Sequence, residues 1–165
     1  MEYRGYDSAG IALNQEDQVF RLRSLGKVSK LDSLMSKHKE YANSGIAHTR
    51  WATHGEPSKG NAHPHGSHDE IFIVHNGIIE NASDLLEDVE KLGYEAKSET
   101  DSEVIVHLLD HELKTGPTNS SILEAFDRTI KKLRGSWAIA VIMTGLDGIL
   151  IARNGAPLIV GRGHN

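Results

Sequence analysis

The sequence predicts an α+β fold in which two β-sheets carry helices on their outer sides. Three observations support this prediction. The first half of the chain is rich in short apolar segments typical of strands, the middle has the apolar period of helices, and strand-like segments return at the end. Because every sheet face and helix stripe has to bury its apolar side, this order of elements favours packed layers.

Composition limits the class of protein further. The chain has 165 residues, which suits one domain, and 38% of them are hydrophobic, as in a globular protein. The net charge of -5 argues against nucleic-acid binding, and no apolar run reaches the length of a membrane span. The N-terminus lacks a signal peptide, and the chain contains no cysteine, so we expect a cytoplasmic protein without disulfides or a membrane partner.

The first elements are predicted from alternating apolar residues and polar turns. Strands are expected at Ser8–Leu13 and Gln18–Leu25, joined by a polar turn over residues 14–17. A helix is expected over Val28–His38, with its apolar residues on one face. Two further strands, Ser44–Trp51 and Ile71–His75, flank a long loop of residues 53–69, and loops of that length are often functional.

Helices are predicted next, followed by a return to strands. Asn81, Ser83 and Asp84 offer caps for a helix over Asp84–Leu92, whose inward residues are Leu85, Leu86, Val89 and Leu92. Further helices are expected at Asp101–Lys114 and Ser120–Leu133, the latter with the apolar stripe Ile122, Leu123, Phe126, Ile130 and Leu133. The closing strands are expected at Ser136–Thr144, Gly148–Arg153 and Pro157–Gly161.

A candidate anion-binding group follows the strand Ser44–Trp51. Arg50 can bind a carboxylate through two parallel hydrogen bonds, and Thr53 and His54 can add donors to the same anion. The alternative is a surface arginine in a salt bridge, which is the more common role of a lone arginine. The neighbouring Thr-His pair and the Asn-Gly pair of a second strand favour a binding site.

Asn76-Gly77 ends the predicted strand Ile71–His75 and has two interpretations. The pair is a strong signal for a type I′ hairpin turn. It could also form an oxyanion hole, with the Asn76 amide and the Gly77 N–H as donors. The segment after it leads toward a helix and not a returning strand, which favours the oxyanion hole.

Asp101 lies in an acidic and hydroxyl-rich segment, residues 98–103, before a predicted helix. Its commonest role is helix capping, by Asp101 or Thr100, and the spacing alone favours that interpretation. The alternative is a carboxylate that accepts hydrogen bonds from a substrate ammonium.

Three histidines, His63, His65 and His68, raise the alternative of a metal site. A zinc site usually needs further ligands, and the chain has neither a cysteine nor an H-E-x-x-H motif. We therefore expect no metal and no cofactor.

The segments together resemble the class II glutamine amidotransferases, which are N-terminal nucleophile hydrolases, and among them the glutaminase domains of the glucosamine-6-phosphate synthase family. Five blocks carry the resemblance in order over nearly the whole chain: residues 2–10, 48–55, 61–65, 74–81 and 98–103. The resemblance implies a four-layer αββα sandwich and one glutaminase domain over residues 1–165.

The resemblance also implies roles for single residues. Arg50, Thr53 and His54 would hold the carboxylate of glutamine, Asp101 its ammonium group, and Asn76 with Gly77 the oxyanion. Trp51 would belong to a loop that closes over the site, and Arg4 would support the nucleophile. Glutamine is the implied ligand, ammonia would pass to fructose 6-phosphate in a sugar isomerase domain, and the parent enzyme would be a homodimer.

One departure from the family concerns the nucleophile. In the family a cysteine at the mature N-terminus attacks glutamine, with its own amine as the base, and here that cysteine, the opening strand and the first helix are missing. We therefore expect Met1 to be an internal methionine used as a start, or the chain to be a fragment cut at both ends. The chain as written is predicted to be inactive, and the alternative function is a non-catalytic glutamine-binding or regulatory module.

Overall fold

The computed structural model describes residues 6–15, 17–38, 41–51, 55–117 and 121–163. The strands are β1 (Ser8–Gln15), β2 (Gln18–Leu25), β3 (Ser44–Arg50), β4 (His65–Ser67), β5 (Ile71–Ile79), β6 (Gly135–Met143) and β7 (Leu150–Asn154). The helices are α1 (Val28–Met35), α2 (Ala82–Lys91), α3 (Glu103–Thr115) and α4 (Ile122–Ile130).

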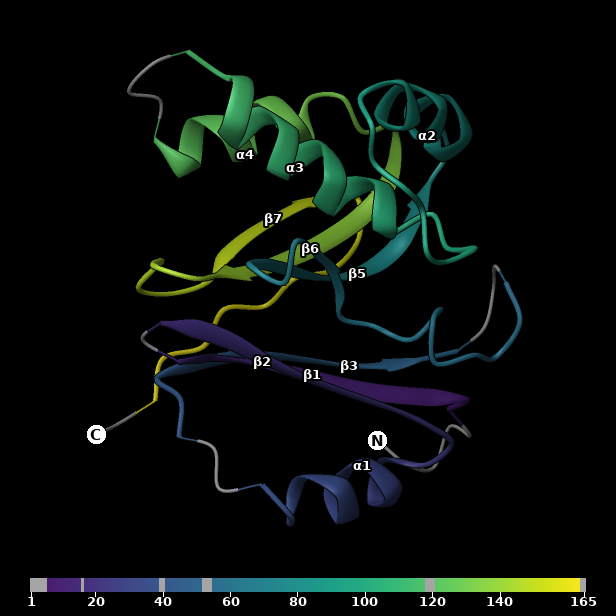
Figure 1. Ribbon diagram of the computed structural model, residues 1–165, viewed down its shortest axis with the longest axis vertical. Coiled ribbons are helices and arrows are strands. Elements are labelled where there is room, and N and C mark those ends of the chain that lie inside the picture. The colour runs from purple at the N-terminus through teal and green to yellow at the C-terminus, as the bar shows by residue number, and fades with distance from the viewer. Residues whose placement is uncertain (1–5, 16, 39–40, 52–54, 118–120, 164–165) are drawn as a thin grey trace.

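These elements form four layers. One antiparallel sheet has the order β2-β1-β3 and the other has the order β4-β5-β6-β7. Figure 1 shows α1 on the outer side of the first sheet and α2, α3 and α4 over the outer side of the second. The two sheets therefore face each other, and the predicted αββα arrangement is confirmed for the described residues.

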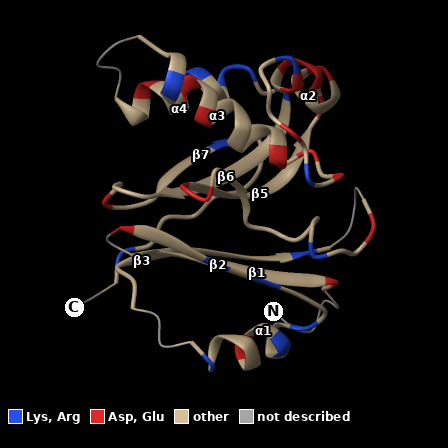
Figure 2. Cartoon of the chain, viewed as in Figure 1, with Lys and Arg blue, Asp and Glu red and all other residues tan. Residues whose placement is uncertain are grey.

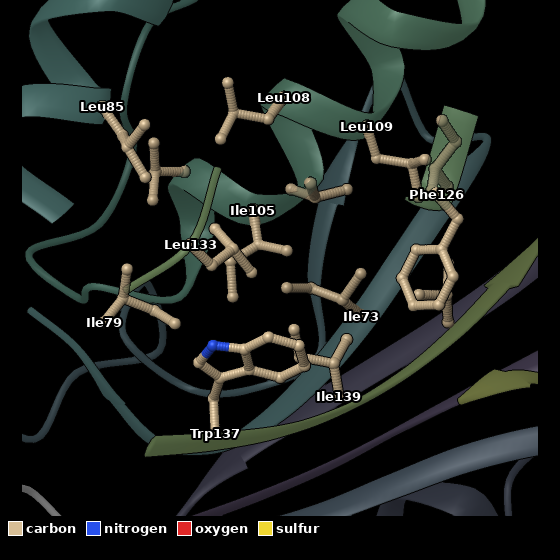
Figure 3. Close-up of a cluster of buried hydrophobic side chains, with 14 of the residues drawn as sticks. Ile73, Ile79, Leu85, Ile105, Leu108, Leu109, Phe126, Leu133, Trp137 and Ile139 are labelled. Atoms are coloured by element: carbon tan, nitrogen blue, oxygen red, sulfur yellow. The ribbon is translucent and has the colours of Figure 1, made fainter. Parts of the chain in front are cut away.

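Buried side chains lie on both faces of β5, at residues 71–73, and of β6, at residues 137–139, 141 and 142, which explains the nearly continuous apolar sequences there. Ile73 and Ile139 point toward α3 and belong to the larger apolar core, where Trp137 packs beside them (Figure 3). The alternate residues Phe72 and Ile142 point the other way, into a smaller core shared with the first sheet. Side chains of a strand alternate between its two faces, so one strand serves both cores.

A glycine in β1 lets the segment before β4 lie against the first sheet. A Cβ atom built on Gly10 would lie 2.1 Å from the carbonyl oxygen of His63, which is far inside van der Waals contact. The guanidinium of Arg23 in β2 donates to the carbonyl oxygens of Gly60 and Ala62 at 3.1 and 2.9 Å. Residues 60–63 are thus fixed between the two sheets.

Two predicted strands and one predicted loop need correction. The strand expected at Ile71–His75 continues to Ile79, because β6 provides partners along its whole length, from Met143 to Gly135. The long loop contains a short strand, β4, which pairs with β5. The strand expected at Pro157–Gly161 is wrong, because none of those residues is in a strand; Ile159 there is 92% exposed.

The helices begin and end within a few residues of the predicted limits, but two apolar residues were misplaced. Leu92 and Leu123 were expected to face inward, and both are exposed. Leu92 follows the last helical residue of α2, and Leu123 lies in the first turn of α4, at the edge of the contact with α3. Asn81 precedes α2 but bonds to Lys132 and Arg134 instead of capping the helix.

Charged side chains are spread over the outer helices (Figure 2). Within the described part of the chain, no helix combines the length and the apolar character that crossing a membrane requires.

We predict that Ile105→Ala in α3 lowers the free energy of unfolding by about 2–5 kcal/mol, because Ile105 is fully buried and its removal leaves a cavity. Urea denaturation measures the change. Leu123→Ala is the matched control: Leu123 is 62% exposed, and the stability should stay within about 0.5 kcal/mol. Equal losses for the two variants would contradict the placement of the core.

Candidate functional site

The strands β3 and β5 bring polar side chains into the space between the sheets. Ile46 of β3 packs in the core between them, so the two-residue repeat places His48 and Arg50 on the same face. In β5, Asn76 shares the face of Phe72 by the same repeat. A hydrogen bond of 2.8 Å between His48 Nε2 and Asn76 Oδ1 joins the two strands.

Arg50 is buried at the end of β3 and not a surface residue, so the surface interpretation is wrong. Its Nη2 donates to the carbonyl oxygen of Gly55 at 3.2 Å, and its Nη1 lies 3.7 Å from Asp7 Oδ1. The backbone N–H of Asp7 donates in turn to the carbonyl oxygen of Arg50 at 3.1 Å. Asp7 therefore holds the guanidinium in place from the start of β1.

Asn76 and Gly77 lie inside β5, where they pair with Ala138 and Trp137 of β6. The hairpin-turn interpretation is therefore wrong. Gly77 has φ +127°, a backbone conformation that residues with a side chain rarely adopt. A Cβ atom there would lie 2.1 Å from the carbonyl oxygen of Ser136. The position requires glycine, and both residues are exposed although they pair with β6.

Asp101 does not cap α3, so the capping interpretation is wrong as well. Its Oδ2 accepts a 2.8 Å hydrogen bond from the backbone N–H of Ile79 in β5, and its Oδ1 accepts a 3.4 Å bond from Ser102 Oγ. Ser102 occupies the cap position and makes no side-chain bond to the helix. Thr100 does not cap α3 either, because its hydroxyl pairs with His65 Nε2 and Ser98 Oγ. Asp101 thus fixes the far end of β5.

A pocket of about 480 Å³ brings the predicted residues together. Arg50 and Trp51 line it from the end of β3, Asn76 and Gly77 from β5, and Asp101 from the segment before α3. Its volume lies in the range of small-molecule sites. Trp51 is 62% exposed at the pocket, as a residue of a covering loop would be. Arg4, Thr53 and His54, also predicted for the site, lie outside the described residues.

Several further residues line the pocket without having been predicted for it, His48 and His63 among them. Tyr6, His75 and Ser102 also line the pocket, and the His75 Nδ1 atom lies 2.8 Å from Ser102 Oγ. Strand periodicity could have indicated His75 as a buried residue, because it shares a face with Ile73. Its pairing with Ser102 could not be read from the sequence, since 27 positions separate the two residues.

Four imidazole rings, those of His48, His63, His65 and His75, form a layer at the pocket, and all of them except His65 line it. The rings of His48 and His63 stack with centroids 4.2 Å apart, and His65 meets His63 edge-on at 4.6 Å. One nitrogen of each ring has a hydrogen-bond partner: the His75 backbone N–H donates to His63 Nδ1 at 3.3 Å, for example, and His65 Nε2 lies 3.0 Å from Thr100 Oγ1.

Burial makes the charged form of these rings unfavourable. It lowers the pKa of His65 to about 3 and that of His75 to about 4, although the carboxylates of Glu103 and Asp101, respectively, oppose the shift. The pKa of His48 is also lowered by burial, and that of His63 is lowered well below its ordinary value by burial and the neighbouring rings. The layer is therefore neutral at pH 7.

The three histidines considered for a metal site do not lie together. His68 does not join His63 and His65: its Nδ1 lies 3.0 Å from Asp110 Oδ2 beside α3. Among the described residues there is no group of three or more His, Cys, Asp or Glu side chains that could hold a metal ion.

Residues 48–164 match a protein family described as a glutamine amidotransferase domain. The chain belongs to the class II glutamine amidotransferases. It is 52% identical over 166 residues to the isomerizing glutamine–fructose-6-phosphate aminotransferase of Escherichia coli K12 and 48% identical over 164 residues to that of Shewanella oneidensis. Each comparison covers 99% of this chain but 26% of the relative, so the chain spans about a quarter of these enzymes.

Solved structures support the amidotransferase fold. The glutamine phosphoribosylpyrophosphate amidotransferase of B. subtilis, complexed with ADP and GMP, superposes with a TM-score of 0.68 at 22% identity, over 86% of this chain and 30% of its own. A structure described as the allosteric regulatory enzyme of purine biosynthesis gives a TM-score of 0.70 at 22% identity, over 85% and 30%. At this identity the likeness shows the fold alone.

The neutral imidazole layer predicts a loss of stability in mild acid. An unfolded histidine binds a proton below about pH 6.5, whereas His75 and His65 in the folded chain do so only near pH 4 and 3. Protons therefore favour the unfolded chain between pH 6.5 and 4, by about 1.4 kcal/mol per pH unit for each such ring. Urea denaturation should show constant stability from pH 8 to 7 and a steady fall from pH 6.5 to 5.

His75→Gln provides the matched control for this pH dependence. Glutamine keeps a hydrogen-bonding group near Ser102 but removes one titrating ring, so the variant should be less stable at pH 8 and lose less stability between pH 6.5 and 5. A wild-type stability that does not change between pH 7 and 5 would contradict the neutral layer.

Proposed function

We propose that the pocket binds free glutamine and that the chain is the glutamine-binding part of a glutaminase domain. The supporting observation is the meeting of Arg50 and Asp101 in one pocket, with the Asn76-Gly77 pair also lining it. A guanidinium complements a carboxylate and a carboxylate complements an ammonium group, so the two charges suit the α-carbon substituents of an amino acid. The carboxamide of glutamine would then extend toward Asn76 and Gly77.

In the proposed reaction a cysteine thiolate attacks the carboxamide carbon of glutamine. The new C–S bond turns the carbonyl oxygen into an oxyanion, which the Asn76 amide and the Gly77 N–H would stabilise. The amide nitrogen takes the proton that the amine of the cysteine removed from the thiol, the C–N bond breaks and ammonia leaves, and water then hydrolyses the thioester to glutamate and frees the thiol. Arg4 would support the nucleophile, Thr53 and His54 would hold the carboxylate of glutamine together with Arg50, and Trp51 would belong to a loop that closes over the site.

The relatives named above are isomerizing glutamine–fructose-6-phosphate aminotransferases, which are about four times as long as this chain. We propose that the whole protein transfers the ammonia to fructose 6-phosphate in a sugar isomerase domain and that it is a homodimer. The second candidate is a non-catalytic glutamine-binding or regulatory module, which would keep the pocket of Arg50 and Asp101 without the chemistry. The coding region upstream of Met1 distinguishes the two: an in-frame segment beginning Met-Cys-Gly supports the glutaminase, and a stop codon directly before Met1 supports the module.

The 165-residue chain should bind L-glutamine without hydrolysing it. We expect a dissociation constant between micromolar and millimolar by calorimetry and no ammonia release in a coupled assay, because the chain has no thiol to attack the amide. Removal of a catalytic nucleophile has cost about 10⁶ in kcat in another hydrolase. A measurable glutaminase rate would contradict the assigned mechanism, and an absence of glutamine binding would contradict the proposed pocket.

Arg50→Lys should weaken L-glutamine binding by about tenfold or more, because lysine cannot form the two parallel hydrogen bonds to a carboxylate. The reason is tested with 4-aminobutanamide, which keeps the ammonium group of glutamine but lacks its α-carboxylate: its weak binding should be the same in both proteins. Arg153→Lys, on the edge strand β7 and outside the pocket, is the matched control and should bind glutamine normally.

Asp101→Asn should weaken L-glutamine by a similar factor but leave the binding of 4-carbamoylbutanoate, which lacks the ammonium group, unchanged. Asparagine can still accept the hydrogen bond from the Ile79 N–H, so the strand stays in place and only the charge is lost. If both ligands weaken equally in calorimetry, Asp101 supports the pocket without contacting the ammonium.

A further inference from the structure

His48 and Asn76 meet across the space between the two sheets. Their side chains approach to 2.8 Å between His48 Nε2 and Asn76 Oδ1. A carboxamide has an accepting oxygen at one end and a donating NH₂ group at the other. Whichever end faces His48 therefore decides which end Asn76 offers to the pocket that it lines.

We propose that His48 is a positioning residue that fixes the orientation of the Asn76 carboxamide. A proton on Nε2 donates to Asn76 Oδ1, and the NH₂ group is then the end that meets a ligand oxygen in the pocket. The inference rests on the proposed function, because the ligand oxygen in question is the side-chain oxygen of glutamine. If the amide were reversed, its own oxygen would face the developing negative charge and repel it.

The surroundings of His48 favour a proton on Nε2. Its Nδ1 atom is buried and has no hydrogen-bond partner among the described residues. A proton on Nδ1 would thus be an orphaned buried donor, which is rarer in proteins than an unmet acceptor. The backbone of His75 lies near the ring and favours its charged form, but it does not reach hydrogen-bonding geometry with Nδ1.

Packing holds the ring of His48 in this position. His63 stacks on it with centroids 4.2 Å apart and ring planes 26° from parallel. His63 is itself fixed, since its carbonyl oxygen lies where a side chain on Gly10 would be and its Nδ1 accepts from the His75 N–H. Gly10 of β1 contacts His63, His63 stacks on His48, and His48 bonds to Asn76. The Asn76 amide is therefore oriented before a ligand binds.

The tautomer of His48 in the ligand-free 165-residue chain is the first test. Nitrogen-15 and carbon-13 NMR distinguish a proton on Nε2 from one on Nδ1. We expect the Nε2–H form at pH 7.5, with a resonance of the ring proton that is protected from exchange and loses that protection in Asn76→Ala. A proton on Nδ1 would overturn the proposal, because Asn76 would then have to turn its NH₂ group toward His48.

The second test compares L-glutamate with L-glutamine as probes by calorimetry. The side chain of glutamate places a charged oxygen where glutamine places a neutral one, and hydrogen bonds to charged oxygens are the stronger ones. His48→Phe keeps a ring to stack on His63 but has no donor. It should weaken L-glutamate about tenfold and L-glutamine no more than about threefold, whereas His48→Gln, which retains an N–H donor, should recover most of the affinity for glutamate.

The outcomes separate this inference from the proposed function. Equal weakening of both ligands in His48→Phe, or no weakening of either, would overturn the positioning role, provided that thermal melting shows the variant to be folded. If the wild-type chain binds neither ligand, the glutamine pocket fails, and the NMR tautomer still decides whether His48 orients the amide.

Discussion

The alternation of side chains along β3 and β5 is the constraint on which the site depends. Ile46 and Phe72 are buried between the two sheets, and a slip of one residue in either strand would turn its apolar side chain to the other face. This register also places His48 and Arg50 on the face of Ile46, and Asn76 on the face of Phe72. These polar side chains therefore lie in the same space between the sheets. The pocket is therefore a consequence of the sheet packing and needs no separate folding of its own.

The space between the sheets is apolar at one end and polar at the other. At the apolar end, Phe72 and Ile142 pack against Ile46 and Ala12. At the polar end, His48 stacks on His63, and these neutral rings bring hydrogen-bonding atoms where aliphatic side chains would have none. Buried polar groups stabilise a fold less than apolar groups of the same size unless they are paired, and most of these rings are paired. The larger core between β5, β6 and the helices offsets this weaker packing.

The sequence predicted the layers and the members of the site better than their local geometry. Arg50, Asn76 and Asp101 could be predicted for one site because each lies in a segment that resembles the amidotransferase family, and the structure places all three at one pocket. Local rules failed where a distant partner overrode them: Asn76-Gly77 is the strongest hairpin signal in the chain, yet β6 holds it in a strand. The imidazole layer could not be predicted, because His48, His63 and His75 come from three separate segments that only the sheet packing brings together.

The same local exceptions explain why the pocket is ordered before a ligand binds. Asp101 lies one residue before the cap position of α3, where a carboxylate would commonly bond to the helix, but its oxygen accepts from the Ile79 N–H instead. Gly77 adopts a positive φ in mid-strand, which is tolerable only because no side chain has to fit against Ser136. Gly77 lets β5 pair closely with β6, and Asp101 bonds the end of β5 to the segment before α3. Groups that are held in this way lose little freedom when they meet a ligand, so more of their interaction energy is available for binding.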